Sequence, residues 1–288
     1  MAFYKVTKKQ SGGGGTTILK GSTAPTSSQG SDGQLYLRYG AANTALLHFE
    51  NSAIEDVFGN TWVAEGNATI SDTQAKFGTK SLYLDASSYI RSNVGDSIFN
   101  FGTNHFTISC WIYPTFSGRK ALFAMSADCR IGCDLFFQQG SANMWLGSNG
   151  NWNAIQSDRG GSDSGIGTIA INTNEWTHIA YIRKGNTCKM FVNGQLAKAT
   201  DIAEGTSVYW TGNDSFQIGK WGGVMDMFTG YIDEFVMVNG SALWDDVFTP
   251  PTQPFDVSDF DNVVLEAYAK VDGAWQTLVG TDIDDIIT

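Results

Sequence analysis

The sequence predicts an all-β protein built as an antiparallel sandwich of two sheets. Three observations support this fold class: many short stretches alternate between apolar and polar residues, turn-rich sequence separates them, and no segment shows sustained helical periodicity with caps. Glycine is abundant, at 33 of 288 residues, whereas proline occurs only 5 times. Many short strands without intervening helices are typical of a sandwich.

Composition divides the chain into three segments. Residues 1–40 are polar and rich in glycine, serine and threonine, which is typical of an extended arm without its own core. Residues 41–255 carry the strand-like pattern and form the predicted sandwich domain. Residues 256–288 hold a small hairpin, with strands over 263–270 and 274–278. An isolated two-stranded ribbon is marginally stable, so we expect this hairpin to dock on the body, on a second copy or on another protein.

The strands of the arm and the body can be placed one by one. In chain order we expect them over residues 34–38, 45–50, 81–85, 88–92, 106–113, 121–125, 134–138, 175–183, 188–192, 215–219 and 230–239. Residues 106–113 alternate strictly, whereas residues 175–183 are apolar on both sides, as in a strand buried between layers. Asn193 and Gly194 directly after residues 188–192 favour a tight hairpin.

Charge and hydropathy exclude several classes of protein. The chain carries 18 Lys and Arg against 29 Asp and Glu, a net charge of −11, which argues against binding to nucleic acid. No apolar run approaches the ~18 residues of a membrane span, so we expect no membrane insertion. Aromatic residues make up 13% of the chain, enough for a sizeable core and too many for general disorder. No secretory leader follows Met1, which predicts synthesis and folding in a cytoplasm.

The cysteines predict packing rather than metal binding. They lie at positions 110, 129, 133 and 188. Cys129 and Cys133 are four residues apart, which would suit a metal, but no second pair follows at zinc spacing. We therefore expect reduced thiols that pack as small hydrophobic side chains.

Six motifs resemble the laminin-G-like, concanavalin A-like lectin/glucanase family. In chain order they lie at residues 46–51, 77–85, 106–113, 175–180, 190–194 and 230–235. Each motif alone is weak, but together they follow the family's order across the body. The resemblance implies a two-sheet jelly roll.

The flanking sequence resembles structural proteins of tailed bacteriophages. Residues 230–244 with 248–252 are similar to such domains in phage proteins, and residues 18–37 are similar to segments of tail and fibre proteins. This resemblance implies a virion component that is made in the host cytoplasm and released by lysis. It also implies docking to other virion proteins through residues 1–40 and 256–288, in an oligomer.

The carboxylates of the closing motif do not match a glycan hydrolase. Glucanases of this fold carry paired acids in a pattern like Glu-x-Asp-x-x-Glu, and a retaining mechanism needs an acid and a nucleophile about 5–5.5 Å apart. Here Tyr231 stands in place of the first acid, and Val236 and Met237 follow instead of the last. We therefore expect Asp233 and Glu234 to have structural roles, and we predict no catalytic residues.

Sugar binding is the favoured chemistry because lectin sites combine aromatic faces with amide and carboxylate side chains. The candidate residues are Asn149, Asn151, Trp152, Asn153, Asp158 and Trp221. The alternative for Trp145 and Trp221 is packing beneath the sheet edges. For Trp152, both the sugar-stacking role and simple packing stay open.

Calcium is a possible ligand, because related domains often hold it at one rim. The acidic loops are residues 158–163, 213–214 and 245–246, none of which forms an EF-hand pattern. A solvated acidic surface is the alternative, so no cofactor is assigned.

These observations predict a non-catalytic phage structural protein that presents a lectin-like domain to host-surface carbohydrate. One alternative is a purely architectural fibre or decoration subunit that binds protein. A third is a glycan-degrading enzyme, which the carboxylate spacing disfavours.

Overall fold

A computed structural model shows the fold of the chain. It describes residues 43–260 apart from 117, 126–129, 137–139, 152, 157–163 and 223–226, together with residue 28 and the strands at 19–21, 35–39, 264–271 and 274–277. The chain divides into two compact units, one of residues 43–257 and one that joins residues 1–42 to residues 258–288.

The smaller unit holds one four-stranded sheet. Its order is β1 (Leu19–Gly21), β2 (Leu35–Tyr39), β18 (Val264–Val271) and β19 (Ala274–Thr277). β18 and β19 form the hairpin that the tail sequence predicts, and β2 from the arm pairs antiparallel with β18. Sequence reasoning treated the arm and the tail as separate segments, whereas their strands share this sheet.

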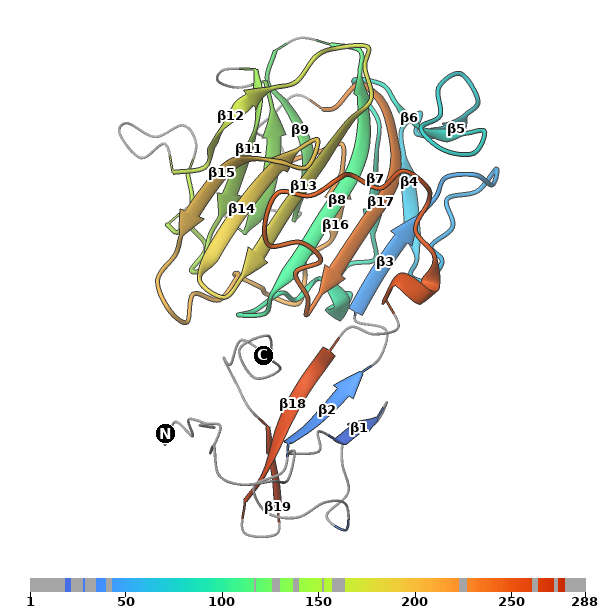
Figure 1. Cartoon of the computed structure of the whole chain (residues 1–288). Helices are drawn as coiled ribbons and strands as arrows, with labels where there is room; N and C mark the ends of the chain where they lie inside the picture. The colour runs from blue at the N-terminus through green and yellow to red at the C-terminus, as the bar shows by residue number, and fades with distance from the viewer. Residues whose placement is uncertain are drawn as a thin grey trace. The chain divides into compact units, whose positions relative to one another are not determined.

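The larger unit is a sandwich of two antiparallel sheets, which confirms the predicted fold class (Figure 1). One sheet has the order β12 (Ile166–Ala170), β11 (Ser141–Leu146), β10 (Ile131–Leu135), β9 (Lys120–Met125), β16 (Phe216–Ile218), β7 (Tyr89–Ser92) and β4 (Trp62–Glu65). The other has the order β15 (Gln195–Asp201), β14 (Thr187–Val192), β13 (Thr177–Lys184), β8 (Phe106–Pro114), β17 (Gly230–Asn239), β6 (Ser81–Leu84) and β5 (Thr69–Ser71), with β3 (Asn43–Leu47) also paired to β17. Two short 3-10 helices, η1 (Ser97–Phe99) and η2 (Val257–Phe260), complete the elements.

Each strand predicted in the body corresponds to an observed strand, and one of them is displaced along the sequence. The expected strand at 134–138 is observed as β10 at Ile131–Leu135. β4, β5, β11, β12 and β15 were not among the predicted ranges. The hairpin at Asn193 and Gly194 is confirmed, because both residues have positive φ and lie between β14 and β15.

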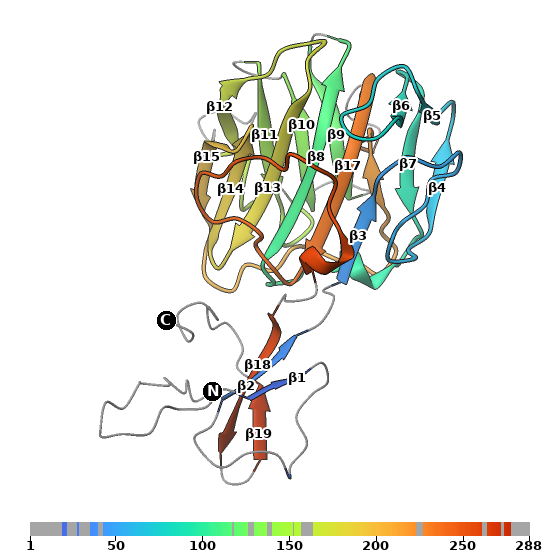
Figure 2. The ribbon, with the colours of Figure 1, turned by 45° about the vertical axis from the view of Figure 1, so that its right-hand side comes forward.

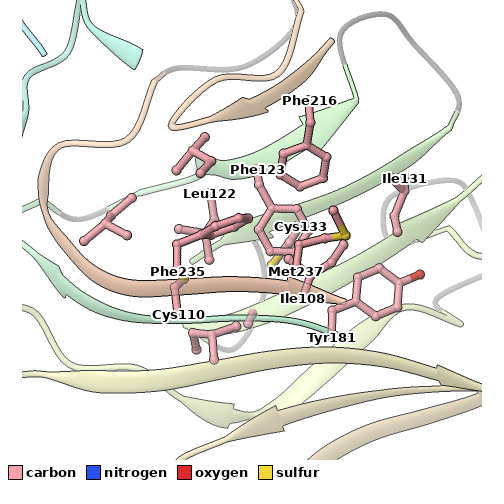
Figure 3. Packing of buried hydrophobic residues seen from close by; sticks show 14 of the residues in the cluster. Ile108, Cys110, Leu122, Phe123, Ile131, Cys133, Tyr181, Phe216, Phe235 and Met237 are labelled. Atoms are coloured by element: carbon pink, nitrogen blue, oxygen red, sulfur yellow. The ribbon is translucent and has the colours of Figure 1, made fainter. Parts of the chain in front are cut away.

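The core lies between the two sheets and is rich in aromatic residues (Figure 3). Alternate residues of the central strands, such as Ile108 and Cys110 on β8, point inward and are buried. The rings of Phe123 and Phe216 stack 5.7 Å apart in this core. Cys110, Cys133 and Cys188 are buried free thiols, which is the packing predicted for them, whereas Cys129 lies outside the described residues.

A strap, residues 240–256, follows β17 and crosses the outer face of the eight-stranded sheet (Figures 1 and 2). Its Trp244 and Phe248 rings stack 4.1 Å apart and pack against Ala180, Ile182 and Phe191 of the sheet. Because these aromatic residues lie on the outer face, the strap gives that face a small apolar layer of its own.

Candidate functional site

The loop that carries the candidate residues Asn149, Asn151 and Asn153 presents their amide side chains to solvent. The Asn153 side chain is bound to Ser148, since its Oδ1 accepts from the Ser148 amide at 2.8 Å and its Nδ2 donates to the Ser148 hydroxyl at 2.8 Å. The Oδ1 of Asn149 accepts the amide of Asn151 at 3.2 Å. These bonds shape the described part of the loop, and the side chain of Asn151 is exposed there.

Tyr209 lies beside this loop, a neighbour that sequence reasoning missed. Its backbone N–H donates to the Gly147 carbonyl at 3.0 Å, and its ring is partly exposed. The Arg130 guanidinium lies 5.1 Å from the ring centroid and pairs with Asp214 at 2.8 Å. An aromatic ring thus stands next to the amides, the combination that sugar sites use.

The other candidates from the sequence do not join this loop. Trp152 and Asp158 lie outside the described residues. Trp221 was predicted to be a sugar-binding residue, but its side chain is only 1% exposed and cannot stack on a sugar ring. Its ring packs edge-on against Trp145 at 5.5 Å, and a Cβ on Gly132 would lie 2.7 Å from it. The alternative considered for both indoles, packing on the sheet, is what the structure shows.

The small residues of β9 and β10 explain this burial. Trp145 and Trp221 form a cluster with Ala121 and Ala124, and Gly132 lies beneath the Trp221 ring. Side chains without bulk leave a depression on the outer face of the seven-stranded sheet, and the two indoles fill it. This face therefore offers no free tryptophan ring among the described residues.

The acids of the closing motif are buried and hydrogen-bonded within the chain. Asp233 is 1% exposed, and its Oδ2 accepts from the backbone amides of Lys76 at 2.8 Å and Phe77 at 3.2 Å. Its Oδ1 accepts from the amide of Glu234 at 2.9 Å. Burial raises the pKa of Asp233 to about 7, and the amides of Phe77 and Lys76 act in the opposite direction.

Glu234 serves as a second internal tie. Its Oε1 lies 2.6 Å from Nδ1 of His48, and its Oε2 accepts from the backbone amide of Phe255 in the strap at 3.1 Å. The hydrogen bond with Glu234 raises the pKa of His48. Glu234 has a φ of +49° at an irregularity of β17, so the strand bends locally to place this side chain. Both acids therefore connect distant parts of the sandwich.

A cavity of about 330 Å³ lies beside Glu234. Its wall includes His48, Glu50, Asp56 and Phe77. The carboxylate of Glu50 accepts the amide of Thr79 and that of Asp56 accepts the indole N–H of Trp62. The acids of this cavity thus have partners within the chain. Among the described residues, no group of three or more His, Cys, Asp or Glu side chains is arranged to hold a metal ion.

Four partly exposed aromatic residues form a continuous row on the outer face of the eight-stranded sheet. This aromatic row consists of Tyr83, Tyr231, Tyr113 and Trp176. Tyr231 of β17 is directly opposite Tyr83 of β6 and Tyr113 of β8, and Trp176 immediately precedes β13. Successive ring centroids are 5.1, 5.9 and 5.6 Å apart. The row therefore runs across four adjacent strands.

The aromatic row faces outward because its neighbours along each strand face inward. Leu82, Ile112 and Ile232, each adjacent to a member of the row, are fully buried in the core. Side chains alternate between the two faces of a sheet, so the row points away from the core. Sequence reasoning missed it because each aromatic belongs to a different motif, and only strand register brings the four together.

Residues 84–248 match the concanavalin A-like lectin/glucanases superfamily. The chain belongs to this superfamily. The search among curated proteins found no match.

The solved structures similar to this chain include two protein domains. Domain 4 of AbnA, a GH43 extracellular arabinanase from Geobacillus stearothermophilus solved with arabinotriose, is 21% identical with a TM-score of 0.53, over 78% of this chain and 100% of that domain. The binding domain of Paraclostridial Mosquitocidal Protein 1 is 17% identical with a TM-score of 0.51, over 77% of this chain. The chain spans about half of that binding domain, 51% of its length. At these identities the likeness shows a shared fold.

Proposed function

We propose that this protein is a non-catalytic carbohydrate-binding protein. The aromatic row carries the proposal, because four adjacent, outward-facing rings provide the apolar faces on which sugar rings stack. The exposed amides of the 147–153 loop, with Tyr209 beside them, are a second candidate contact on the same domain. The arabinanase domain solved with arabinotriose supports this choice of ligand class by analogy of fold alone.

The buried acids support the non-catalytic part of the proposal. Asp233 and Glu234 are 1% and 3% exposed, and both accept hydrogen bonds from the chain's own backbone. A glycoside hydrolase needs two carboxyl groups that reach the scissile bond from opposite sides. Both side chains are buried, and although Glu234 forms part of the wall of the cavity beside His48, Asp233 does not line it, so the two acids cannot act as a pair on one glycosidic bond.

A glycan array with the whole chain tests the proposal. We expect binding to one class of glycan, and we expect Trp176→Ala to weaken it while Tyr89→Ala leaves it unchanged. Tyr89 is the matched control, since it is a partly exposed tyrosine of β7 in the other sheet. A reducing-sugar assay on the bound glycan should stay at background. No binding to any glycan would reject the proposal, and hydrolysis that Asp233→Asn abolishes would reject its non-catalytic part.

We also propose that the protein acts in a phage particle. This proposal rests on the sequence resemblance of residues 18–37 and 230–252 to phage structural proteins. The smaller unit, in which β2 of the N-terminal segment pairs with β18 of the C-terminal segment, is the candidate for attachment to other virion proteins. Immunogold labelling of particles released by lysis tests this placement, and unlabelled particles would reject it. Labelled particles combined with an empty glycan array would favour the purely architectural role.

A further inference from the structure

We infer that the aromatic row takes a single extended chain of neutral sugars, lying across the strands. This inference rests on the proposed function and deepens it by naming the ligand class. Neighbouring strands lie about 4.8 Å apart, so a row across four strands spans roughly 15 Å. That span is several sugar rings long, and a monosaccharide would cover only part of it.

The covered residues next to the row restrict a ligand to this direction. The adjacent outward positions are Asp233, Trp111 and His178, all at most 7% exposed. Phe77 packs edge-on against Trp111 at 6.1 Å, and Trp244 of the strap packs edge-on against His178 at 5.6 Å. These groups form a wall along one side of the row. The strap and the 76–77 loop cover the adjacent part of the outer face and leave the aromatic row accessible.

The polar residues on the other side of the row include the neutral Thr115 and Asn174 and the acid Asp85, which follows β6. Thr115 follows β8, and its amide donates to the Thr229 carbonyl at 3.1 Å. Asn174 is exposed near Trp176, and its amide donates to the Pro114 carbonyl at 2.8 Å. Hydroxyl and amide side chains bind sugar hydroxyls without selecting a charge.

The charges around the row disfavour an anionic glycan. Lys76, a cation beside the wall of the row, lies 3.7 Å from the centroid of the Trp111 ring and is engaged there. Glu175 is exposed beside Trp176, and the whole chain carries a net charge of −11. A neutral glycan is therefore the electrostatic complement of this surface, whereas an anionic one would be repelled.

The ring orientations favour a single soluble chain over a crystalline surface. Successive ring planes of the row are inclined by 46°, 76° and 59°. Rings inclined in this way do not form one plane, so they cannot all lie flat on a crystalline polysaccharide. A single flexible chain can turn its successive sugars to meet them.

Calorimetric titration with oligosaccharide ladders tests this inference. The probes are neutral oligomers of one to six units (β-1,4-linked glucose, β-1,4-linked xylose and α-1,5-linked arabinose) and galacturonate oligomers of the same lengths. We expect the affinity for one neutral series to rise with each unit until all four rings are contacted. Tyr83→Ala and Trp176→Ala, at the two ends of the row, should each weaken binding of the longest oligomer about tenfold, equivalent to about 1.4 kcal/mol. Tyr89→Ala should leave it unchanged, and galacturonate should bind at least tenfold more weakly.

The outcomes separate this inference from the proposed function. A monosaccharide that binds as tightly as the hexamer, equal binding of galacturonate, or wild-type affinity in both end variants would overturn the inference while glycan binding itself survives. Loss of binding in Asn151→Ala with wild-type affinity in the end variants would move the site to the 147–153 loop. No binding by any oligomer would reject the proposed function together with the inference. Thermal melting of each variant confirms that a loss of affinity is not a loss of fold.

Discussion

Asp233→Asn should change how the stability of the sandwich depends on pH. In the folded protein, burial raises the pKa of Asp233 to about 7, from 3.8 for an ordinary aspartate. The folded state therefore binds more protons than the unfolded state between these two pH values. The stability contributed by protonated Asp233 is fully present below about pH 3.8 and is lost as the pH rises through about 7.

The magnitude follows from the size of the shift. Each pKa unit corresponds to about 1.4 kcal/mol, so the raised pKa predicts a total loss of about 4 kcal/mol, of which about 3 kcal/mol falls between about pH 4.5 and about pH 7.5. The asparagine side chain of the variant cannot ionise but keeps one oxygen for the amides of Lys76 and Phe77. The free energy of unfolding of the variant should therefore be flatter across this range.

Urea unfolding across this pH range measures the effect. The wild-type curve minus the Asp233→Asn curve should fall by about 3 kcal/mol from the acidic to the neutral end. Asp245→Asn is the control, because the hydrogen bond from Lys189 lowers the pKa of Asp245 and its contribution changes only below that range. Parallel curves for wild type and Asp233→Asn would refute this account of the buried acid. Glycan binding should be the same in both proteins, since Asp233 is enclosed.

Three further changes test other contacts. Trp244→Ala removes the stack on Phe248 and the contact with His178, and should lower the free energy of unfolding in urea by about 2–4 kcal/mol; an unchanged midpoint would mean that the strap adds no stability. Gly194→Ala should lower the free energy of unfolding by about 2–3 kcal/mol in the same assay, because its Cβ would overlap the Phe248 carbonyl. Gly205 also has a positive φ but lies in open space, so Gly205→Ala should lower it by only about 1 kcal/mol. Equal losses of stability in the two variants would contradict the overlap. The pKa of His48 is raised in the folded protein, so the stability that protonated His48 contributes is lost as the pH rises through that folded pKa. The difference in thermal stability between wild type and His48→Gln should therefore be larger at about pH 6 than at about pH 9. A difference that is constant with pH would argue against the pair with Glu234.

The strands with clear alternation were predictable from sequence, and the weaker ones were not. β8 alternates apolar and polar residues, so its period is visible in the sequence even though the folded sandwich buries both of its faces, whereas β17 was predicted from its closing motif. β5 has only three residues, too few to show a period. β10 was placed too late because Gly132 resembles a turn residue, whereas its missing side chain makes room for Trp221.

The candidate site was less predictable than the fold because it depends on register. Trp221, between Lys220 and Gly222, has polar and flexible neighbours that suggest exposure, and only the small residues of β9 and β10 explain its burial. Conversely, Tyr113 and Tyr231 are distant in sequence, and no local pattern indicates that they lie opposite each other. Loop amides such as Asn149 are exposed because a tight polar loop cannot be buried without unpaired backbone groups, and their role as sugar ligands stays a prediction.

The position of β17 in its sheet has a consequence for how the protein is made. This strand pairs with β3, β6 and β8, so residues 230–239 hold together elements that emerge from the ribosome much earlier. Until those residues are synthesised, the edges of β6 and β8 have no partner there and expose backbone groups to other chains. We therefore expect the sandwich to fold slowly and largely after synthesis, as contacts between distant segments generally require. Nascent chains that stop before residue 230 should be prone to aggregation and dependent on chaperones.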